Sequence, residues 1–158
     1  MLVSPQVMQF WEDKAKTYGP GLAGALFGGA WWFWIDACSA SGTKVPFVQY
    51  LPGFVATLAL IMINAIRREE LESHDPFDEG VFCRSRFWLF LSYVVSFASI
   101  VGSVAVLLSQ YALKPGVENP WPGVAGLCQV TLILASALLF FVSRTPSSES
   151  NYGGYGAF

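Results

Sequence analysis

The stretch GGAWWFWIDACSA, residues 28–40, closes an apolar block that begins at Gly21 and contains no Lys or Arg. A helix needs roughly 20 mostly apolar residues to cross a hydrocarbon core of about 30 Å. Three further blocks of this kind follow, so the expected helices span residues 21–39, 45–66, 87–109 and 121–142. The sequence therefore predicts an all-α fold, a four-helix transmembrane bundle.

The composition also indicates a membrane protein. Of 158 residues, 54% are hydrophobic and 13% are charged, and the mean hydropathy is +0.48. A soluble domain of this length is less apolar, so many of these side chains are expected to face lipid. We expect the lipid bilayer to be the main partner of the chain and expect no nucleic acid.

The distribution of Lys and Arg predicts the orientation in the membrane. With four spans, both termini and the loop 67–86 share one side, which carries seven of the nine basic residues; Lys44 and Lys114 lie on the other. Basic residues are enriched in cytosolic loops. We therefore expect the N and C termini to be cytosolic.

The three longest segments outside the expected helices are the two ends of the chain and the loop 67–86. The sequence of residues 1–20 predicts an amphipathic segment that lies on the cytosolic leaflet, and a disordered tail is the alternative. The loop 67–86 is expected to be charged and solvated, and residues 143–158 are expected to form a disordered tail. In that tail, Tyr155 and Phe158 fit the short pattern of a sorting signal, which often arises by chance.

Small residues recur at helical spacing in two of the blocks. Helices in lipid associate through close backbone packing and interhelical hydrogen bonds rather than through hydrophobic drive. We predict helix-packing or partner-binding faces on the first and third helices, and the sequence does not separate contacts within the bundle from contacts with another protein. The residues are Gly24, Gly28, Gly29, Ala98, Ser99, Gly102 and Ser103.

Polar residues inside the blocks are few, and Asp36, Asn64 and Gln129 stand out. Asp36 lies about 22 Å along its helix from Gly21, past the midplane of the bilayer. We favour an interfacial carboxylate there over an ion or proton relay or a structural hydrogen bond. For Asn64 and Gln129 we favour hydrogen bonds between helices over a joint site. The expected interfacial anchors are Trp31, Trp32, Trp34, Trp88 and Trp121.

The sequence gives little support for catalysis. His74 is the single histidine, and the three cysteines have no paired spacing, so we expect no metal, no cofactor and no catalytic residue. Cys83 precedes the third helix and is a candidate for palmitoylation, although a plain buried thiol is the favoured interpretation.

An ordered set of short segments resembles the transmembrane protein 50 family. The segments are Gly29–Trp32, Ile35–Ala37, Met62–Ala65, Arg86–Phe90, Trp121–Ala125, Gln129 and Arg144–Thr145, with Ser99 between them. No single segment is specific, but their order and spacing are. Val130 and the Ser/Gly/Tyr-rich tail depart from the pattern of the family.

The resemblance implies a function. The family, which includes the fungal vacuolar protein sorting-associated protein 68, is understood as four-span, non-enzymatic proteins of endosomal and secretory membranes. It implies a subunit that supports sorting from the late endosome to the vacuole or lysosome, in complex with a small four-span protein of the vacuolar protein sorting-associated protein 55 type. The late endosome or vacuole membrane is the expected location, with the endoplasmic reticulum and Golgi as alternatives.

Two other functions remain open from the sequence. One is a small ion or proton transporter or channel subunit that uses Asp36. The other, with less support, is a scaffold that organises lipid without a stable protein partner.

Overall fold

The structure is a computed structural model that describes residues 5–42, 44–66, 79–113, 115–116 and 119–144. Its regular structure is helical throughout these residues, which contain no strand. The elements run in the order α1 (Pro5–Ala40), η1 (Phe47–Gln49), α2 (Leu51–Asn64), α4 (Glu79–Leu107), η2 (Leu108–Ala112) and α5 (Trp121–Ser143). The predicted all-α class is confirmed.

Helix α1 is longer than the block that predicted it. It runs for 36 residues without a break and contains Pro20 in its interior. A proline there removes one backbone hydrogen bond, but membrane helices tolerate this where neighbouring helices support the backbone. The expected boundary near residue 20 is therefore not a helix end, and the amphipathic segment continues directly into the apolar block.

Helices α2 and α4 also differ from their expected bounds. A short 3-10 turn, η1, precedes α2, whose first turn carries Pro52, where a missing N–H leaves no bond unmade. Helix α4 begins at Glu79, so the last part of the expected loop, residues 79–86, is helical. An acidic residue at the start of a helix is stabilised by the helix dipole, and this favours the early start.

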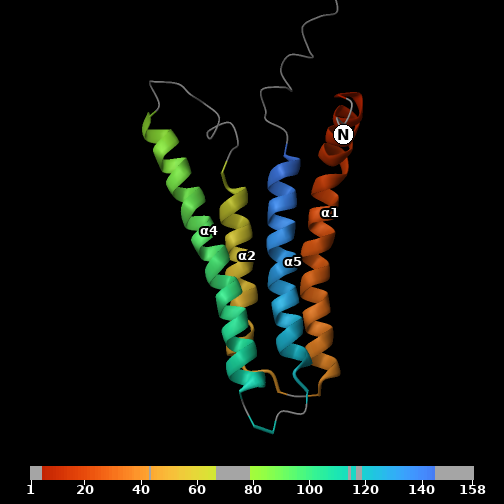
Figure 1. The fold of residues 1–158 in the computed structure, drawn as a ribbon, viewed down its shortest axis with the longest axis vertical. Coiled ribbons are helices and arrows are strands. Elements are labelled where there is room, and N and C mark those ends of the chain that lie inside the picture. The colour runs from red at the N-terminus through yellow and green to blue at the C-terminus, as the bar shows by residue number, and fades with distance from the viewer. Residues whose placement is uncertain (1–4, 43, 67–78, 114, 117–118, 145–158) are drawn as a thin grey trace, which may run out of the picture.

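Helix α5 matches its expected bounds to within one residue and is the centre of the fold. It contacts α1, α2 and α4, whereas α1 packs mainly on α5. Figure 1 shows α4, α2, α5 and α1 following one another across the view. The short connections after α1 and η2 lie together at one end, called here the short-loop end; Pro5 and the end of α5 lie at the opposite end.

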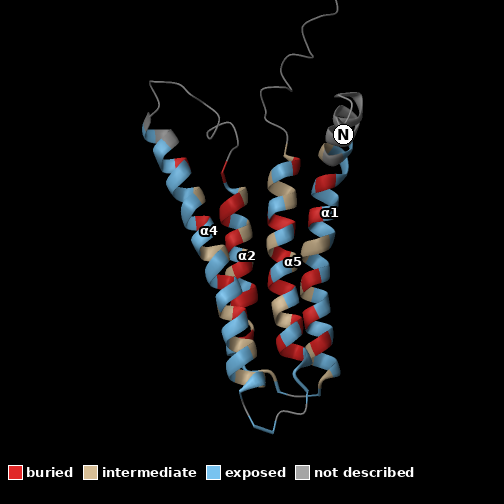
Figure 2. Ribbon diagram, viewed as in Figure 1, coloured by how far each residue is buried: buried red, intermediate tan, exposed pale blue. Residues whose placement is uncertain are grey.

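Small side chains dominate the interior. One buried cluster joins Ala30, Ala56, Val130 and Ile133 from three helices. At the short-loop end, residues from all four long helices line a small internal void, among them Trp34, Pro52, Ser103 and Gly126. Figure 2 shows that burial follows the facing sides of the helices and that most of α4 is exposed. Such close packing through small residues is typical of helices in lipid.

Three segments are long and apolar enough to cross a membrane: Phe47–Asn64, Cys83–Ala112 and Trp121–Ser143. Helix α1 has the length to span but is less apolar, since its sequence includes several glycines, two lysines and Asp36. The described residues thus establish a helical membrane protein with three such segments, and a fourth span remains a proposal.

Candidate interaction surfaces

One side of α1, called here the inner face, packs along α5. It consists of Gly19, Ala23, Ala30, Trp34 and Ala37, all of them buried. A side-chain atom on Gly19 would collide with Ser143 near the end of α5. The Ser136 hydroxyl donates a 2.7 Å hydrogen bond to the backbone oxygen of Ala23. The inner face therefore follows α5 over most of its length.

The glycines predicted as a packing face lie on other sides of α1. Gly24, Gly28 and Gly29, called here the outer glycine face, are exposed, and a Cβ built on any of them would meet no atom within 4 Å. The bundle therefore does not use these glycines for its own packing. The sequence left open contact within the bundle and contact with another protein, and the structure excludes the first for these glycines. They are exposed to lipid or to another protein.

The predicted small residues of α4 divide in the same way. Ser99 and Ser103 are buried, Gly102 is half-buried, and Ala98 is exposed. The serine hydroxyls donate to carbonyl oxygens one turn earlier in their own helix, Ser99 to Ser96 at 2.7 Å and Ser103 to Ile100 at 3.2 Å. Their polarity is thus satisfied locally, and their small size permits close packing inside the bundle.

Gln129 is packed directly against a glycine of α2. Its side chain is 1% exposed, and a Cβ added to Gly53 would lie 2.9 Å from Oε1 and 3.0 Å from Nε2. Among the described residues, no group accepts a hydrogen bond from Nε2. A buried amide with an unmade bond is costly, and Gly53 is the residue that makes room for it.

Asn64 and Arg144 join the ends of α2 and α5. The Asn64 amide nitrogen donates to Leu60 O at 2.9 Å and lies 3.5 Å from Ala137 O on α5. Arg144 Nη1 donates to Asn64 O at 2.6 Å and lies 3.5 Å from Ile66 O. A guanidinium on the last carbonyls of a helix satisfies acceptors that lack partners within the helix and favours the negative end of its dipole.

Asp36 is separated from the other two polar positions. It is exposed on α1 about one turn before the helix ends at Ala40, whereas Gln129 is buried and Asn64 is half-buried between α2 and α5. The structure therefore does not bring the three intramembrane polar residues together.

The five predicted tryptophan anchors have different environments. Trp32 is 77% exposed, and Trp88 and Trp121 are also exposed, although the Trp88 indole donates to Met62 O at 3.1 Å. Trp31 is half-buried against Phe54, with 5.4 Å between ring centroids. Trp34 corrects the prediction, because it is 1% exposed and packs edge-on against Tyr50 at 4.6 Å. A tryptophan enclosed by protein is a core residue rather than a membrane anchor.

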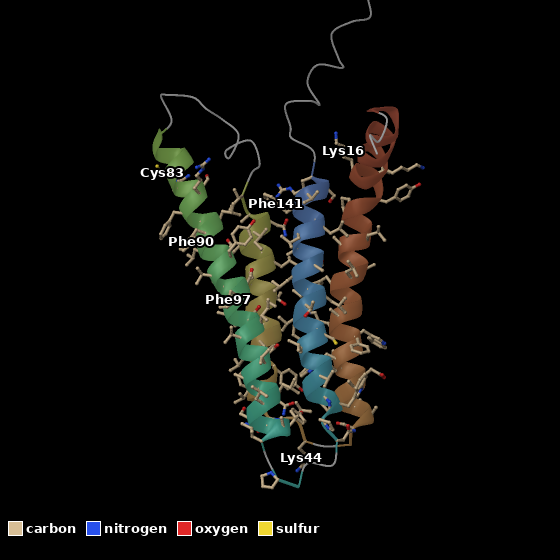
Figure 3. The ribbon with its side chains drawn as sticks, viewed as in Figure 1. Lys16, Lys44, Cys83, Phe90, Phe97 and Phe141 are labelled. Carbon is tan, nitrogen blue, oxygen red and sulfur yellow. The ribbon has the colours of Figure 1, made fainter. Side chains whose placement is uncertain are left out.

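The remaining predicted site residues are placed only in part. Cys83 is exposed near the start of α4, as Figure 3 shows, so the buried-thiol interpretation does not hold for it. Tyr155 and Phe158 lie outside the described residues. Within the part of the chain that is described, no group of three or more His, Cys, Asp or Glu side chains is placed to hold a metal ion.

Sequence reasoning missed several interior contacts. The Tyr111 hydroxyl donates to Gln49 Oε1 at 2.6 Å, which joins η2 to η1. The contact of Arg144 with the end of α2 was not expected either. One signal was present: both α2 and α5 begin with a Pro-Gly pair, Pro52-Gly53 and Pro122-Gly123, and all four residues are buried. A glycine directly after a helix-starting proline marks the place where a neighbour packs closely.

The outward side chains of α4 complete the evidence for the class of protein. Phe90 and Phe97 are 64% and 69% exposed and point away from the other helices in Figure 3. Long helices with a small-residue interior and large apolar side chains outside define an integral membrane protein.

Comparison with known proteins identifies the group within that class. Residues 2–152 match the model of the uncharacterised protein family UPF0220, and the chain belongs to this family. The "Transmembrane protein 50 homolog" of Dictyostelium discoideum is 33% identical over 84% of this chain and 92% of its own length. The "Vacuolar protein sorting-associated protein 68" of Saccharomyces cerevisiae is 23% identical over 85% of this chain and 84% of its own length. These relatives confirm the resemblance to the transmembrane protein 50 family, and no solved structure matches the chain.

Proposed function

We propose that this protein is a non-enzymatic membrane subunit that supports protein sorting from the late endosome to the vacuole or lysosome. The observation that carries the proposal is the similarity to a relative named for vacuolar protein sorting, which extends over most of both chains. The late endosome or vacuole membrane is the proposed location.

The proposed subunit acts in a complex with another small multi-span membrane protein. The resemblance to the transmembrane protein 50 family suggests a partner of the vacuolar protein sorting-associated protein 55 type. The structural support is the outer glycine face, since Gly24 and Gly28 are one turn apart, exposed and without a neighbour within 4 Å of an added Cβ. Paired glycines at this spacing permit close approach of a second helix.

Replacing these glycines tests the complex. Gly24→Leu and Gly28→Leu place a branched side chain where a partner helix would approach, so the partner is expected to be lost on purification in mild detergent. Ala135→Leu is the control, because Ala135 is also small and exposed but belongs to α5. All three chains should insert into the membrane. Unchanged co-purification of the partner with both glycine variants would remove the outer glycine face from the interface.

The sorting role has its own measurement. Cells that lack the protein are expected to secrete a soluble vacuolar or lysosomal hydrolase that the wild-type chain retains on re-expression. If the hydrolase reaches its compartment normally in cells without the protein, the sorting function is wrong even where a partner is found.

We also propose that α1 crosses the membrane as a fourth span. Its 36 residues correspond to about 54 Å of helix, which exceeds a hydrocarbon core of about 30 Å. It also packs beside α5, itself apolar enough to span, from Gly19 opposite Ser143 to Trp34 beside Gly126. A helix held along a span over this distance lies at the same depth in the bilayer.

The orientation proposed with four spans has both termini in the cytosol. Lys16 and Lys44 lie at opposite ends of the bundle in Figure 3, and Arg84, Arg86 and Arg144 belong to the Lys16 end. An Asn-x-Thr glycosylation site inserted between Pro115 and Gly116 should be glycosylated, whereas the same site appended after Phe158 should not. With a site also added before Met1, glycosylation at both termini but not between Pro115 and Gly116 would reverse the orientation, and glycosylation at one terminus but not at the other would exclude the fourth span.

A further inference from the structure

A pocket of about 310 Å³ lies at the short-loop end, between the last turns of α1 and the segment that leads into α2. Its size falls at the lower limit for small-molecule sites in proteins. The α1 side contributes Trp34, Ile35, Cys38 and Ser39, and Val45 and Tyr50 close the opposite side. The pocket shares no residue with the outer glycine face.

The lining has the chemistry of a site for an uncharged amphiphile. None of its six residues carries a formal charge at neutral pH. Ile35 and Val45 are aliphatic walls, and Tyr50 lies edge-on to the buried Trp34 with ring centroids 4.6 Å apart. Ser39 adds a hydroxyl that can both donate and accept a hydrogen bond. The lining residues themselves offer a phosphate head group no cation, whereas they offer a single alcohol group a hydrogen-bonding partner.

Two aromatic side chains outside the pocket lie further along the bundle, toward its middle. Trp31 lies one turn before Ile35 on α1, Phe54 lies one turn after Tyr50 on α2, and their rings are 5.4 Å apart. From Ser39 to Trp31 is about 12 Å of helix, which is less than one leaflet of a hydrocarbon core of about 30 Å. The site thus offers a polar end near the membrane surface and an aromatic seam that extends into one leaflet.

We propose that this pocket binds a sterol, with the sterol hydroxyl at Ser39 and the ring system along the seam of Trp31 and Phe54. A rigid ring system loses little conformational freedom on binding, whereas the two flexible chains of a diacylglycerol must be ordered. A flat aliphatic ring system also covers the faces of two aromatic side chains without requiring a charged partner. The site is independent of the sorting function proposed above.

Photolabelling of the full-length chain tests the site. The purified protein in phosphatidylcholine nanodiscs is exposed to a sterol carrying a diazirine and an alkyne. Ile35→Trp fills the pocket, and Ile61→Trp is the matched control, because both isoleucines are exposed, at 51% and 59%, and Ile61 lies on α2 outside the pocket. Labelling of Ile35→Trp should fall about tenfold, which corresponds to about 1.4 kcal/mol of binding free energy, while Ile61→Trp labels as wild type.

A competition experiment distinguishes a sterol from a diacylglycerol, since each of these lipids carries one hydroxyl group. Excess unlabelled sterol should suppress labelling of the wild-type chain, and an equal amount of diacylglycerol should not. Equal competition by both lipids would overturn the assignment to a sterol. Equal labelling of the two tryptophan variants would overturn the pocket as the site.

Cys38 gives a second readout that does not depend on a pocket-filling variant. It lines the pocket and is half-buried, so sterol in the nanodisc should slow its reaction with a water-soluble maleimide in a chain with Cys83→Ser and Cys128→Ser. The chain that retains only Cys83, which is exposed at the start of α4, is the control and should react equally with and without sterol. Equal rates at Cys38 in the two lipid mixtures would contradict the proposal.

Discussion

The two sides of α1 are built from the same residue types and do opposite things. The inner face meets α5 through a glycine, three alanines and a tryptophan, whereas the outward side carries glycines and Trp32 without a neighbour inside the bundle. On the inner face a small residue allows α5 to pack closely against α1. On the outward side it leaves a surface open to lipid or to another chain, so residue type alone does not reveal the role of a small-residue face.

The two tryptophans should show the clearest contrast. Trp34→Ala removes a side chain that is 1% exposed and should lower the free energy of unfolding by about 3–5 kcal/mol, the usual cost of deleting a buried aromatic. Trp32→Ala, at a position 77% exposed, should change it by less than about 0.5 kcal/mol. Unfolding in detergent measures both. Equal losses would mean that the inner face does not hold the fold.

Adding volume tests the same two sides in the opposite direction. Ala30→Leu forces a larger side chain into the fully buried cluster between α1, α2 and α5 and should cost about 1–3 kcal/mol of stability. Ala25→Leu makes the same change at an exposed position and should leave the melting temperature nearly unchanged. A stable Ala30→Leu chain would show that α1 can move away from α5 at little cost.

Replacing Gly19 and replacing Gly21 with alanine should change the stability of the protein in opposite directions. Gly19→Ala brings a methyl group against Ser143 and should destabilise by about 1 kcal/mol, as overpacking does. Gly21→Ala meets nothing within 4 Å and should stabilise by up to about 1 kcal/mol, because alanine favours helix. Thermal unfolding of the two single variants decides the signs, and a stabilised Gly19→Ala chain would contradict the close approach of α1 and α5 at this point.

The smallest expected change concerns one hydrogen bond across the inner face. Ser136→Ala removes the bond to Ala23 O and should cost about 0.6 kcal/mol, the average for interhelical bonds measured in a membrane protein. The control is Thr131→Ala, because the exposed Thr131 hydroxyl bonds only within its own helix, to Leu127 O. A Ser136→Ala loss no greater than the control would show that the bond adds nothing to the packing of α1.

The sequence predicted where the helices lie along the chain better than it predicted which helices pack against one another. Residues 121–142 were expected to be helical and α5 spans Trp121–Ser143, because the apolar block begins at a proline and ends at a charge. The start of α4 was missed because its first residues are polar and precede the apolar block. The continuity of α1 was missed because a glycine followed by a proline, Gly19-Pro20, usually interrupts a helix. Packing against Ser143, which local sequence does not show, accompanies the unbroken helix there.

For the candidate interaction surfaces, the sequence predicted which residue types take part but not the direction in which they point. Gly24 and Gly28 were singled out as small residues at helical spacing, but the direction in which they point depends on where α5 lies. The serines of α4 show the same limit, since Ser99 faces the interior while its neighbour Ala98 does not. Trp34 was misassigned because a tryptophan near the end of an apolar block is usually interfacial, and only the tertiary contact with Tyr50 shows that this one is enclosed.

The central place of α5 has a consequence for biosynthesis. The helix that contacts the other three is the last of the four described long helices to be made. The surface of α1 that packs on α5 and the carbonyls that Arg144 covers at the end of α2 therefore lack these partners until residue 144 has been translated. Until then the earlier helices expose the alanines and glycines that α5 later covers. A chain truncated before Trp121 would lack the surface on which most of α1 packs, and α1 would meet the pair α2 and α4 only through contacts such as those of Trp31 with Phe54 and Trp34 with Tyr50.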